Sequence, residues 1–210
     1  MKPKLICIIG ETASGKDKVV HEAIARITSH KIRTVCSYTD RPIRKTETDG
    51  VEHYFVTTDE FNYLKKTHEN DILAYTHIKN ANNPNHKGYQ YMAFIDELYK
   101  SHIYVIDYCG LLNLKARYGD TVDTVLVYIT APYETRLNRA RASRSDFNTE
   151  FKTRVDAEEA QFSNFRNSDL QRYTIYNDDG EFDSSVNLLC EIIVQELLDD
   201  TDISNYPKQA

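Results

Sequence analysis

A glycine-framed loop between an apolar run and a helix-like segment constrains this chain more than any other feature. The run over residues 5–9 leads into Gly10, and after four intervening residues Gly15 and Lys16 precede a segment with helical spacing over 18–27. The two glycines permit a tight turn whose N–H groups converge on an anion. The positive end of the following helix strengthens that field, and Lys16 adds a point charge. Strand, loop and helix in this order predict a phosphate-binding loop.

The residue after Lys16 departs from the usual motif. Asp17 stands where a Ser or Thr hydroxyl ordinarily binds magnesium. A hard cation prefers oxygen ligands, so Asp17 is able to hold Mg²⁺ directly or through water. It also places a negative charge near the bound phosphates, which leaves its role open. The loop predicts phosphate binding without indicating what receives the phosphate.

Length and charge limit the class of protein. With 210 residues, 40% hydrophobic and 28% charged, the chain is typical of a globular protein whose core fits one domain. We expect that domain over residues 1–198 and a polar tail over 199–210. The net charge of −6 argues against general binding to nucleic acid or to membrane surfaces. No apolar stretch is long enough to span a membrane, and the run before Gly10 is too short for a signal peptide.

Cysteine usage indicates the compartment. The four cysteines are far apart and include no CxxC pair: Cys7, Cys36, Cys109 and Cys190. Three of them lie in apolar segments, which favours buried free thiols over a zinc site. Free thiols are typical of a reducing setting, so we expect a cytoplasmic protein.

Strand-like and helix-like segments alternate along the chain. Strand patterns occur at 5–9, 31–37, 54–56, 72–78, 103–106, 122–129 and 173–176, and helical patterns at 16–28, from 57 or 58 onward, 92–99, 111–118, 133–142, 149–168 and 182–198. This alternation predicts an α/β fold, a parallel sheet with helices on both faces. Ligands of such folds bind beyond the carboxyl ends of the strands. Gly10, Ser37, Asp107 and Thr130 all stand at predicted strand ends, so we expect them to border one cleft.

The segment over 37–50 carries a second candidate anion site. Arg41 and Arg44 lie three residues apart beside hydroxyl groups, and a guanidinium binds phosphate through two parallel hydrogen bonds. Taken alone, a solvated surface loop with incidental salt bridges is the favoured interpretation.

The same segment closely resembles the monophosphate-binding part of guanylate kinases. In register with that family's motif are Ser37, Thr39, Arg41, Arg44, Glu47, Asp49, Gly50, Phe55, Val56, Glu60 and Phe61. The resemblance continues at 106–110, in an arginine-rich region and at 176–179, and it spans nearly the whole chain. It implies a P-loop NTPase fold with an acceptor-binding subdomain over about 36–98 and a helical lid over about 136–160.

The resemblance also implies an activity and its residues. The activity is transfer of a phosphoryl group from ATP, with Mg²⁺, to a nucleoside monophosphate, and GMP or dGMP is the first candidate. The ATP site would comprise Gly10, Glu11, Thr12, Ala13, Ser14, Gly15, Lys16, Asp17 and Asn177, with Asp17 as the metal ligand. The catalytic cations would be Lys16, Arg41, Arg144 and Arg154. The acceptor would contact Ser37, Arg41, Arg44, His53, Tyr54, Ala74, Tyr89 and Asp107. We interpret Arg136, Arg139 and Arg141 as a solvated helix face.

Several positions depart from the family pattern, mostly on the acceptor side. Ala74 replaces the Glu that pairs with the N1–H and amino groups of guanine, and without it those donors lose a partner. His53 replaces a phosphate-contacting Tyr, although Tyr54 is adjacent. Tyr89 ends an altered motif, His-Lys-Gly-Tyr over 86–89. The donor side therefore follows the family more closely than the side that reads the base.

These departures keep three alternatives open. Ribose 1,5-bisphosphate phosphokinases share the fold, carry Asp after the loop lysine and lack the guanine-reading Glu. A kinase for another nucleoside monophosphate would need an acceptor pocket rebuilt around Tyr75, His77 and the loop over 80–87. A guanylate-kinase-like binding module typically loses the loop lysine, so the presence of Lys16 favours an enzyme.

Overall fold

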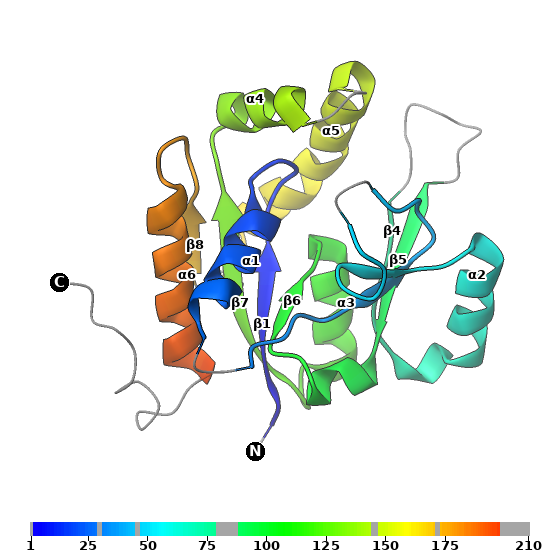
Figure 1. Ribbon diagram of the computed structural model, residues 1–210. Coiled ribbons are helices and arrows are strands. Elements are labelled where there is room, and N and C mark those ends of the chain that lie inside the picture. The colour runs from blue at the N-terminus through cyan, green and yellow to red at the C-terminus, as the bar shows by residue number, and fades with distance from the viewer. Residues whose placement is uncertain are drawn as a thin grey trace.

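A parallel sheet forms the centre of the protein. The computed structural model describes residues 2–28, 31–44, 47–78, 88–143, 147–170 and 173–197 (Figure 1). Four strands pair in the order β6-β1-β7-β8, and they are β1 (Lys4–Ile9), β6 (Ile103–Val105), β7 (Asp123–Thr130) and β8 (Tyr173–Tyr176). Every pairing is parallel, so the strands all end at the edge where Gly10 follows β1.

Helices cover both faces of this sheet, because its central strand is apolar on both sides. All residues of β1 after Lys4 are buried, which is typical of a central parallel strand. Helices α1 (Lys16–Arg26) and α6 (Phe182–Leu197) pack on one face through side chains such as Val20 and Leu189. Helices α3 (Tyr108–Tyr118) and α5 (Phe147–Arg166) cover the other face. The predicted α/β fold is confirmed.

Helix α4 and the upper part of α5 extend beyond the carboxyl edge of the sheet. Helix α4 (Tyr133–Ser143) follows β7 directly. In Figure 1 it lies above the loop that joins β1 to α1, and α5 descends from the same region along the sheet. Two helices from the second half of the chain thus lie next to the phosphate loop.

A second sheet is formed by the segment between 37 and 94. Its order is β3-β2-β5-β4, with β2 (Ser37–Thr39), β3 (His53–Phe55), β4 (Ile72–Ile78) and β5 (Tyr89–Phe94). Strand β5 runs antiparallel to β2 and β4, whereas β2 and β3 are parallel. Helix α2 (Thr58–Thr67) and a 3-10 turn (Glu69–Asp71) connect β3 to β4. Helix α3 packs against β4 and so joins the two sheets.

Helix α2 begins where its sequence predicts. The Thr57 hydroxyl accepts a hydrogen bond from the backbone N–H of Glu60, and the Glu60 carboxylate accepts one from the N–H of Thr57. This reciprocal pair satisfies two donors that the first turn of a helix leaves free. One face of the second sheet is thereby covered by a helix with a well-defined start.

Two predicted segments are wrong, one beside the edge strand β6 of the central sheet and one in the second sheet. The strand predicted over 31–37 is reduced to a bridge between Thr34 and Ile103, and a strand begins only at Ser37. The helix predicted over 92–99 is the end of β5 followed by a 3-10 helix, Ile95–Tyr99. Met92 packs beneath α2 and Ala93 beneath α3. A strand buried on both faces produces a continuous apolar run, which periodicity alone does not distinguish from a helix.

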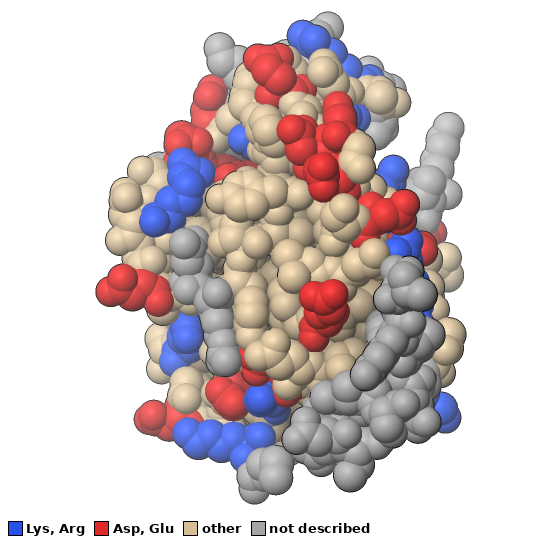
Figure 2. Space-filling view, turned by 90° about the vertical axis from the view of Figure 1, so that its left-hand side faces the viewer, with Lys and Arg blue, Asp and Glu red and all other residues tan. Residues whose placement is uncertain are grey.

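Buried thiols and dispersed surface charges characterise the folded chain (Figure 2). The four cysteines are free, with Cys109 exposed and the other three buried. In the part of the chain that the structure describes, no helix is both long and apolar enough to cross a membrane. Figure 2 shows scattered groups of acidic and basic side chains on a face whose middle is mostly uncharged.

Replacing Phe61 with Ala should weaken the second sheet. Phe61 is fully buried between Ile72 and Met92, so truncation should lower the free energy of unfolding by about 3 kcal/mol or more. Tyr63 lies on the same helix with 67% of its surface exposed, and Tyr63→Ala serves as the matched control. Urea unfolding of both variants measures the difference. Equal effects of the two substitutions would contradict the packing described here.

Candidate active site

The phosphate loop runs from Gly10 to Lys16 and depends on close backbone contacts. A Cβ at Gly10 would lie 2.2 Å from the carbonyl oxygen of Ile129, so only glycine fits beside β7. Gly15 has φ of +85°, and a Cβ there would lie 2.5 Å from Asn177 Nδ2. Ala13 also has a positive φ, 63°. Left-handed residues on both sides of Ser14 turn successive N–H groups inward, as a phosphate cradle requires.

Donors from later segments satisfy the carbonyl groups of this loop. Arg136 Nη1 donates to Thr12 O at 3.3 Å, and Arg139 Nη1 donates to Ser14 O at 3.2 Å. Asn177 Nδ2 donates to the same Ser14 oxygen at 2.8 Å. Turning the N–H groups inward turns carbonyls outward, and buried carbonyls need partners. These three side chains therefore hold the loop in its anion-binding shape.

The interpretation of Arg136 and Arg139 as a solvated helix face is wrong. Arg136 is only 7% exposed, and Arg139 also donates to the backbone oxygen of Asn177 at 2.8 Å. Arg141 is exposed, as expected. The helix α4 has no apolar stripe that would have identified an inward face. Two of its arginines point inward because they donate hydrogen bonds to carbonyl groups of a loop more than 120 residues earlier. The local spacing of residues does not reveal such a contact.

Asn177 is placed against the loop rather than at an open surface. Its side chain is 1% exposed and its Oδ1 has no hydrogen-bond partner in the described structure. It follows β8, whose last residue pairs with Thr130. Its predicted position at the donor site therefore has a structural basis, and its contact with adenine stays a prediction.

Glu158 of α5 binds the phosphate loop through both carboxylate oxygens. Oε2 accepts from the backbone N–H of Thr12 at 2.8 Å, and Oε1 accepts from the Thr12 hydroxyl at 2.6 Å. An anion is therefore already held by donors of the loop. Glu158 was not predicted from the sequence, because a glutamate on a polar helix has no local signal that separates it from a solvated one.

A second acidic residue lies beneath the loop. Glu11 is 5% exposed, accepts a very short hydrogen bond from the Tyr128 hydroxyl and pairs with Arg166 Nη1 at 3.2 Å. Burial, together with the bond to Glu11, raises the pKa of Tyr128 to about 12. Arg166 comes from the end of α5, so that helix contacts the loop at two positions.

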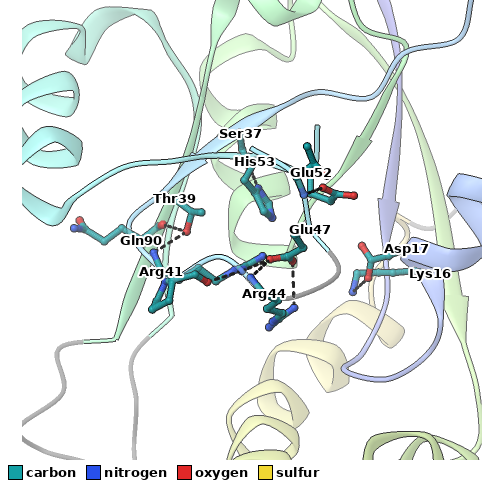
Figure 3. A network of polar contacts seen from close by, with 12 residues as sticks. Lys16, Asp17, Ser37, Thr39, Arg41, Arg44, Glu47, Glu52, His53 and Gln90 are labelled. Carbon is teal, nitrogen blue, oxygen red and sulfur yellow. Dashed lines mark hydrogen bonds and ion pairs between the residues drawn. The ribbon is translucent and has the colours of Figure 1, made fainter. Parts of the chain in front are cut away.

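Lys16 and Asp17 lie at the open end of the loop. Lys16 Nζ is 3.5 Å from Asp17 Oδ2, and the Asp17 side chain is 77% exposed. In Figure 3 both side chains point toward the segment that carries Arg44 and Glu47. Among the described residues no three His, Cys, Asp or Glu side chains form a metal-binding group. Mg²⁺ commonly takes one or two carboxylates together with substrate phosphates, so an exposed Asp17 fits such an ion.

The predicted acceptor cations form a compact cluster around Glu47. Arg41 is 6% exposed and donates to both Glu47 oxygens, at 2.7 and 2.6 Å (Figure 3). Arg44 Nη1 lies 3.7 Å from the same carboxylate with half of its side chain exposed. Burial opposes the charge of Glu47, yet hydrogen bonds from Arg41 and from the Arg44 backbone hold its pKa below the ordinary value. The guanidinium of Arg41 also lies 5.1 Å from the Phe55 ring centroid.

Ser37 and His53 complete this cluster from neighbouring strands. Ser37 and His53 pair directly in the β2–β3 register, and Ser37 Oγ lies 2.8 Å from His53 Nδ1. Burial, and then the charge of Arg41, lower the pKa of His53 to about 4. The imidazole is therefore neutral at pH 7, with one ring nitrogen bonded to Ser37.

Tyr54 is separated from the other predicted acceptor residues. Neighbouring strand residues point to opposite faces, and Tyr54 packs against Tyr38, with ring centroids 4.8 Å apart. Tyr38 belongs to the apolar cluster beneath α2. A role for Tyr54 as a substitute for the family's phosphate-contacting Tyr is therefore not supported by its position.

Asp107, Ala74 and Tyr89 occupy three different settings. Asp107 caps helix α3, with Oδ1 accepting from the N–H of Gly110 at 3.0 Å. Ala74 is 2% exposed and packs in the apolar cluster beneath α3. Tyr89 begins β5 opposite Ile78.

The structure does not describe the side chains of the two predicted lid cations. Arg144 falls outside the described residues, as does the side chain of Arg154, whose backbone belongs to α5. Their catalytic roles stay predictions. Residues 80–87, a candidate for a rebuilt acceptor pocket, also lie outside the described residues.

A phosphate loop facing a second cluster of cations, on an α/β sheet, defines the class of P-loop phosphotransferases with two substrate sites. Comparison with known proteins identifies the family. A family model described as guanylate kinase matches residues 2–196. The chain belongs to the guanylate kinase family.

Individual relatives agree with this assignment. A guanylate kinase of Chlamydia felis is 30% identical over 201 residues, covering 92% of the chain and 89% of the relative. A guanylate kinase of Chlorobaculum tepidum is 28% identical, covering 84% of the chain and 85% of the relative. A match to the Thermotoga maritima guanylate kinase is also 28% identical but covers only 63% of the chain and 59% of that relative. These relatives favour the guanylate kinase family over the alternative kinases considered from the sequence.

A solved structure supports the fold. The crystal structure of guanylate kinase from Anaplasma phagocytophilum matches with a TM-score of 0.62 at 19% identity, covering 100% of the chain and 98% of that protein. At this identity the likeness concerns the fold alone.

Removing the Glu158 carboxylate should loosen α5 from the phosphate loop. Two charge-assisted hydrogen bonds are lost in Glu158→Ala, so we expect the free energy of unfolding to fall by about 1–2 kcal/mol. Asp156 is exposed on the same helix with no hydrogen bond or ion pair in the described structure, and Asp156→Ala is the control. Thermal or urea unfolding without nucleotide measures both. A stability of Glu158→Ala equal to that of the control would show that the contact contributes nothing.

The neutral state of His53 should make the protein less stable in mild acid. The unfolded imidazole takes a proton near pH 6.5, whereas the folded one takes it only near pH 4. Between these values the unfolded state binds more protons, so stability falls as the pH falls, by about 1–2 kcal/mol between pH 7 and 5. Urea unfolding at both pH values measures the change. His53→Gln should flatten this dependence, whereas His21→Gln, at an exposed position on α1, should leave it intact.

Proposed function

We propose that the protein transfers the terminal phosphoryl group of ATP to GMP, or to dGMP, and releases ADP and the nucleoside diphosphate. Family membership over residues 2–196 supports the reaction class. The observation that carries the proposal is the position of Lys16, which points toward the Arg44–Glu47 segment from across the site (Figure 3). A donor-phosphate cation and acceptor-phosphate cations in one site are what direct transfer between two nucleotides requires.

The reaction is a displacement at phosphorus. An oxygen of the acceptor phosphate forms a bond to the γ-phosphorus, and the bond from that phosphorus to the bridging oxygen breaks. ADP leaves with the electron pair, and no redox step occurs. Catalysis of this kind rests on positioning and on neutralising charge, with no protein nucleophile.

Each side of the site has a distinct task in this proposal. The inward N–H groups of the loop and Lys16 hold the donor phosphates. Arg41, already fixed by Glu47, and the more exposed Arg44 hold the acceptor phosphate, with Ser37 and the neutral His53 as uncharged hydrogen-bonding partners. Asp17 would hold Mg²⁺, which when bound neutralises phosphate charge. Arg144 and Arg154 remain the proposed lid cations.

The charge on Arg44 is better suited to bind an incoming phosphate than that on Arg41. Arg41 is buried and makes a bidentate pair with Glu47, whereas Arg44 is 3.7 Å from Glu47 and largely exposed. An exposed guanidinium with a distant partner loses little interaction free energy when it binds a phosphate dianion instead. Arg41 then positions the segment that presents Arg44.

Replacing Lys16 with Ala should abolish phosphoryl transfer without unfolding the protein. Loss of a cation from the transferred group lowers kcat by about 100-fold or more. Lys18, two residues later and exposed on α1, provides the control Lys18→Ala, which should retain activity. A coupled assay of ADP release with GMP, dGMP, other monophosphates and ribose 1,5-bisphosphate measures both variants. Activity confined to the sugar phosphate or to a pyrimidine nucleotide would overturn the proposal.

A further inference from the structure

A carboxylate stands on the inward face of helix α5. Three phenylalanines of this helix are buried and follow helical spacing, and they are Phe151, Phe162 and Phe165. Glu158 lies seven residues after the first of them and four before the second, so it shares their face. A glutamate at such a position must find hydrogen-bond donors, because a carboxylate withdrawn from water is costly to leave unpaired.

The phosphate loop supplies those donors. Glu158 accepts from the backbone N–H of Thr12 at 2.8 Å and from the Thr12 hydroxyl at 2.6 Å, one bond to each carboxylate oxygen. Thr12 is only 7% exposed, so its donors are shielded while Glu158 is in place. Two anions at hydrogen-bond distance from the same pair of donors would repel each other strongly. A phosphate therefore takes these donors only if Glu158 leaves them.

The C-terminal end of α5 is held by contacts of a different kind. Arg166 Nη1 lies 3.2 Å from the buried carboxylate of Glu11. Phe165 packs against Tyr128 in an edge-to-face arrangement, with ring centroids 5.0 Å apart. These contacts lie beneath the loop and do not involve Thr12. A ligand that takes the Thr12 donors thus breaks the contact of Glu158 and leaves the end of the helix attached.

We infer that Glu158 is a latch, which holds α5 on the phosphate loop while no donor nucleotide is bound and which the phosphates of the donor release. The inference rests on the proposed function and adds a conformational step to its donor half. A phosphate group brings more negative charge to the Thr12 donors than a carboxylate does, so it displaces Glu158, whose carboxylate returns to water. Arg166 and the aromatic contacts keep the end of α5 in place, so the released part is the part that precedes them.

The latch couples occupancy of the loop to the position of the helix. A ligand shifts a conformational equilibrium only if its interaction free energy differs between the two states. Here the difference is whether Thr12 is bonded to Glu158 or to phosphate. Arg154, a predicted lid cation, stands four residues before Glu158 in α5. The stretch that carries it is therefore released for closure over a bound donor and held back when the loop has no nucleotide.

Binding of a nonhydrolysable ATP analogue tests the latch without phosphoryl transfer. Glu158→Ala removes the internal anion, so we expect its dissociation constant for the analogue to fall about tenfold below that of the wild type. Asp156→Ala removes an equal charge from an exposed position of the same helix, and its dissociation constant should stay within about twofold of the wild type. Calorimetric titration measures all three proteins. Equal affinities of the wild type and Glu158→Ala, or an equal gain in both variants, would overturn the inference.

The amide proton of Thr12 reports the latch directly. In NMR spectra without nucleotide, its resonance should differ between the wild type and Glu158→Gln, because the acceptor changes from a carboxylate to an amide. When the analogue saturates both proteins, the two resonances should converge, since phosphate is then the acceptor in each. Resonances that stay as far apart as before would contradict the inference. If Glu158→Ala does not fold, Glu158→Gln replaces it in the titrations, again with tighter binding than the wild type.

These measurements fail separately from the proposed function. A protein that binds the analogue and shows both effects at Glu158, but phosphorylates no monophosphate, would refute the proposed function and support the latch. Transfer to GMP together with an unchanged affinity in the Glu158 variants would support the function and refute the latch. If neither the wild type nor the variants bind the analogue, both are refuted.

Discussion

Hydrogen bonds from distant segments to the phosphate loop are the constraint on which the rest of the structure depends. A loop that turns its N–H groups toward an anion must turn carbonyls outward, and those carbonyls are buried. Arg136 and Arg139 from α4 and Asn177 from the end of β8 supply the missing donors. The second half of the chain is therefore fixed to the end of β1, and the positions of α4 and α5 follow from the needs of the loop.

The segment that follows strand β2 holds two arginines close together around one carboxylate, Glu47. Glu47 neutralises the charge of the buried Arg41, whereas Arg44 stays exposed beside the same carboxylate. Breaking one partner of a buried pair leaves an uncompensated charge, so the geometry of this segment depends on both residues. His53 adds a hydrogen-bonding group that burial keeps uncharged. Arg44 is thus the arginine of this cluster whose charge is most accessible.

The central fold was predictable from the sequence, whereas the second sheet was only partly so. Strand β1 and the glycine-framed loop carry strong local signals, and the amphipathic α6 was identified almost to its ends. Residues 92–99 were misassigned because β5 is buried on both faces. Arg136, Arg139 and Glu158 were not recognised as loop ligands, since their inward orientation is set by carbonyl and N–H groups far away in the sequence. Ala74 was read in the right strand, but its burial under α3 came from tertiary packing.

The contact between Glu158 and Thr12 competes with any phosphate that binds to the same donors of the loop. Two donors of the loop already bind the Glu158 carboxylate, at 2.8 and 2.6 Å. A ligand that takes these donors does so by exchange, and its measured affinity is the difference between two binding reactions. Weak binding of a small phosphate would then reflect a strong internal competitor rather than a poor cradle, and α5 would leave the loop as the ligand entered.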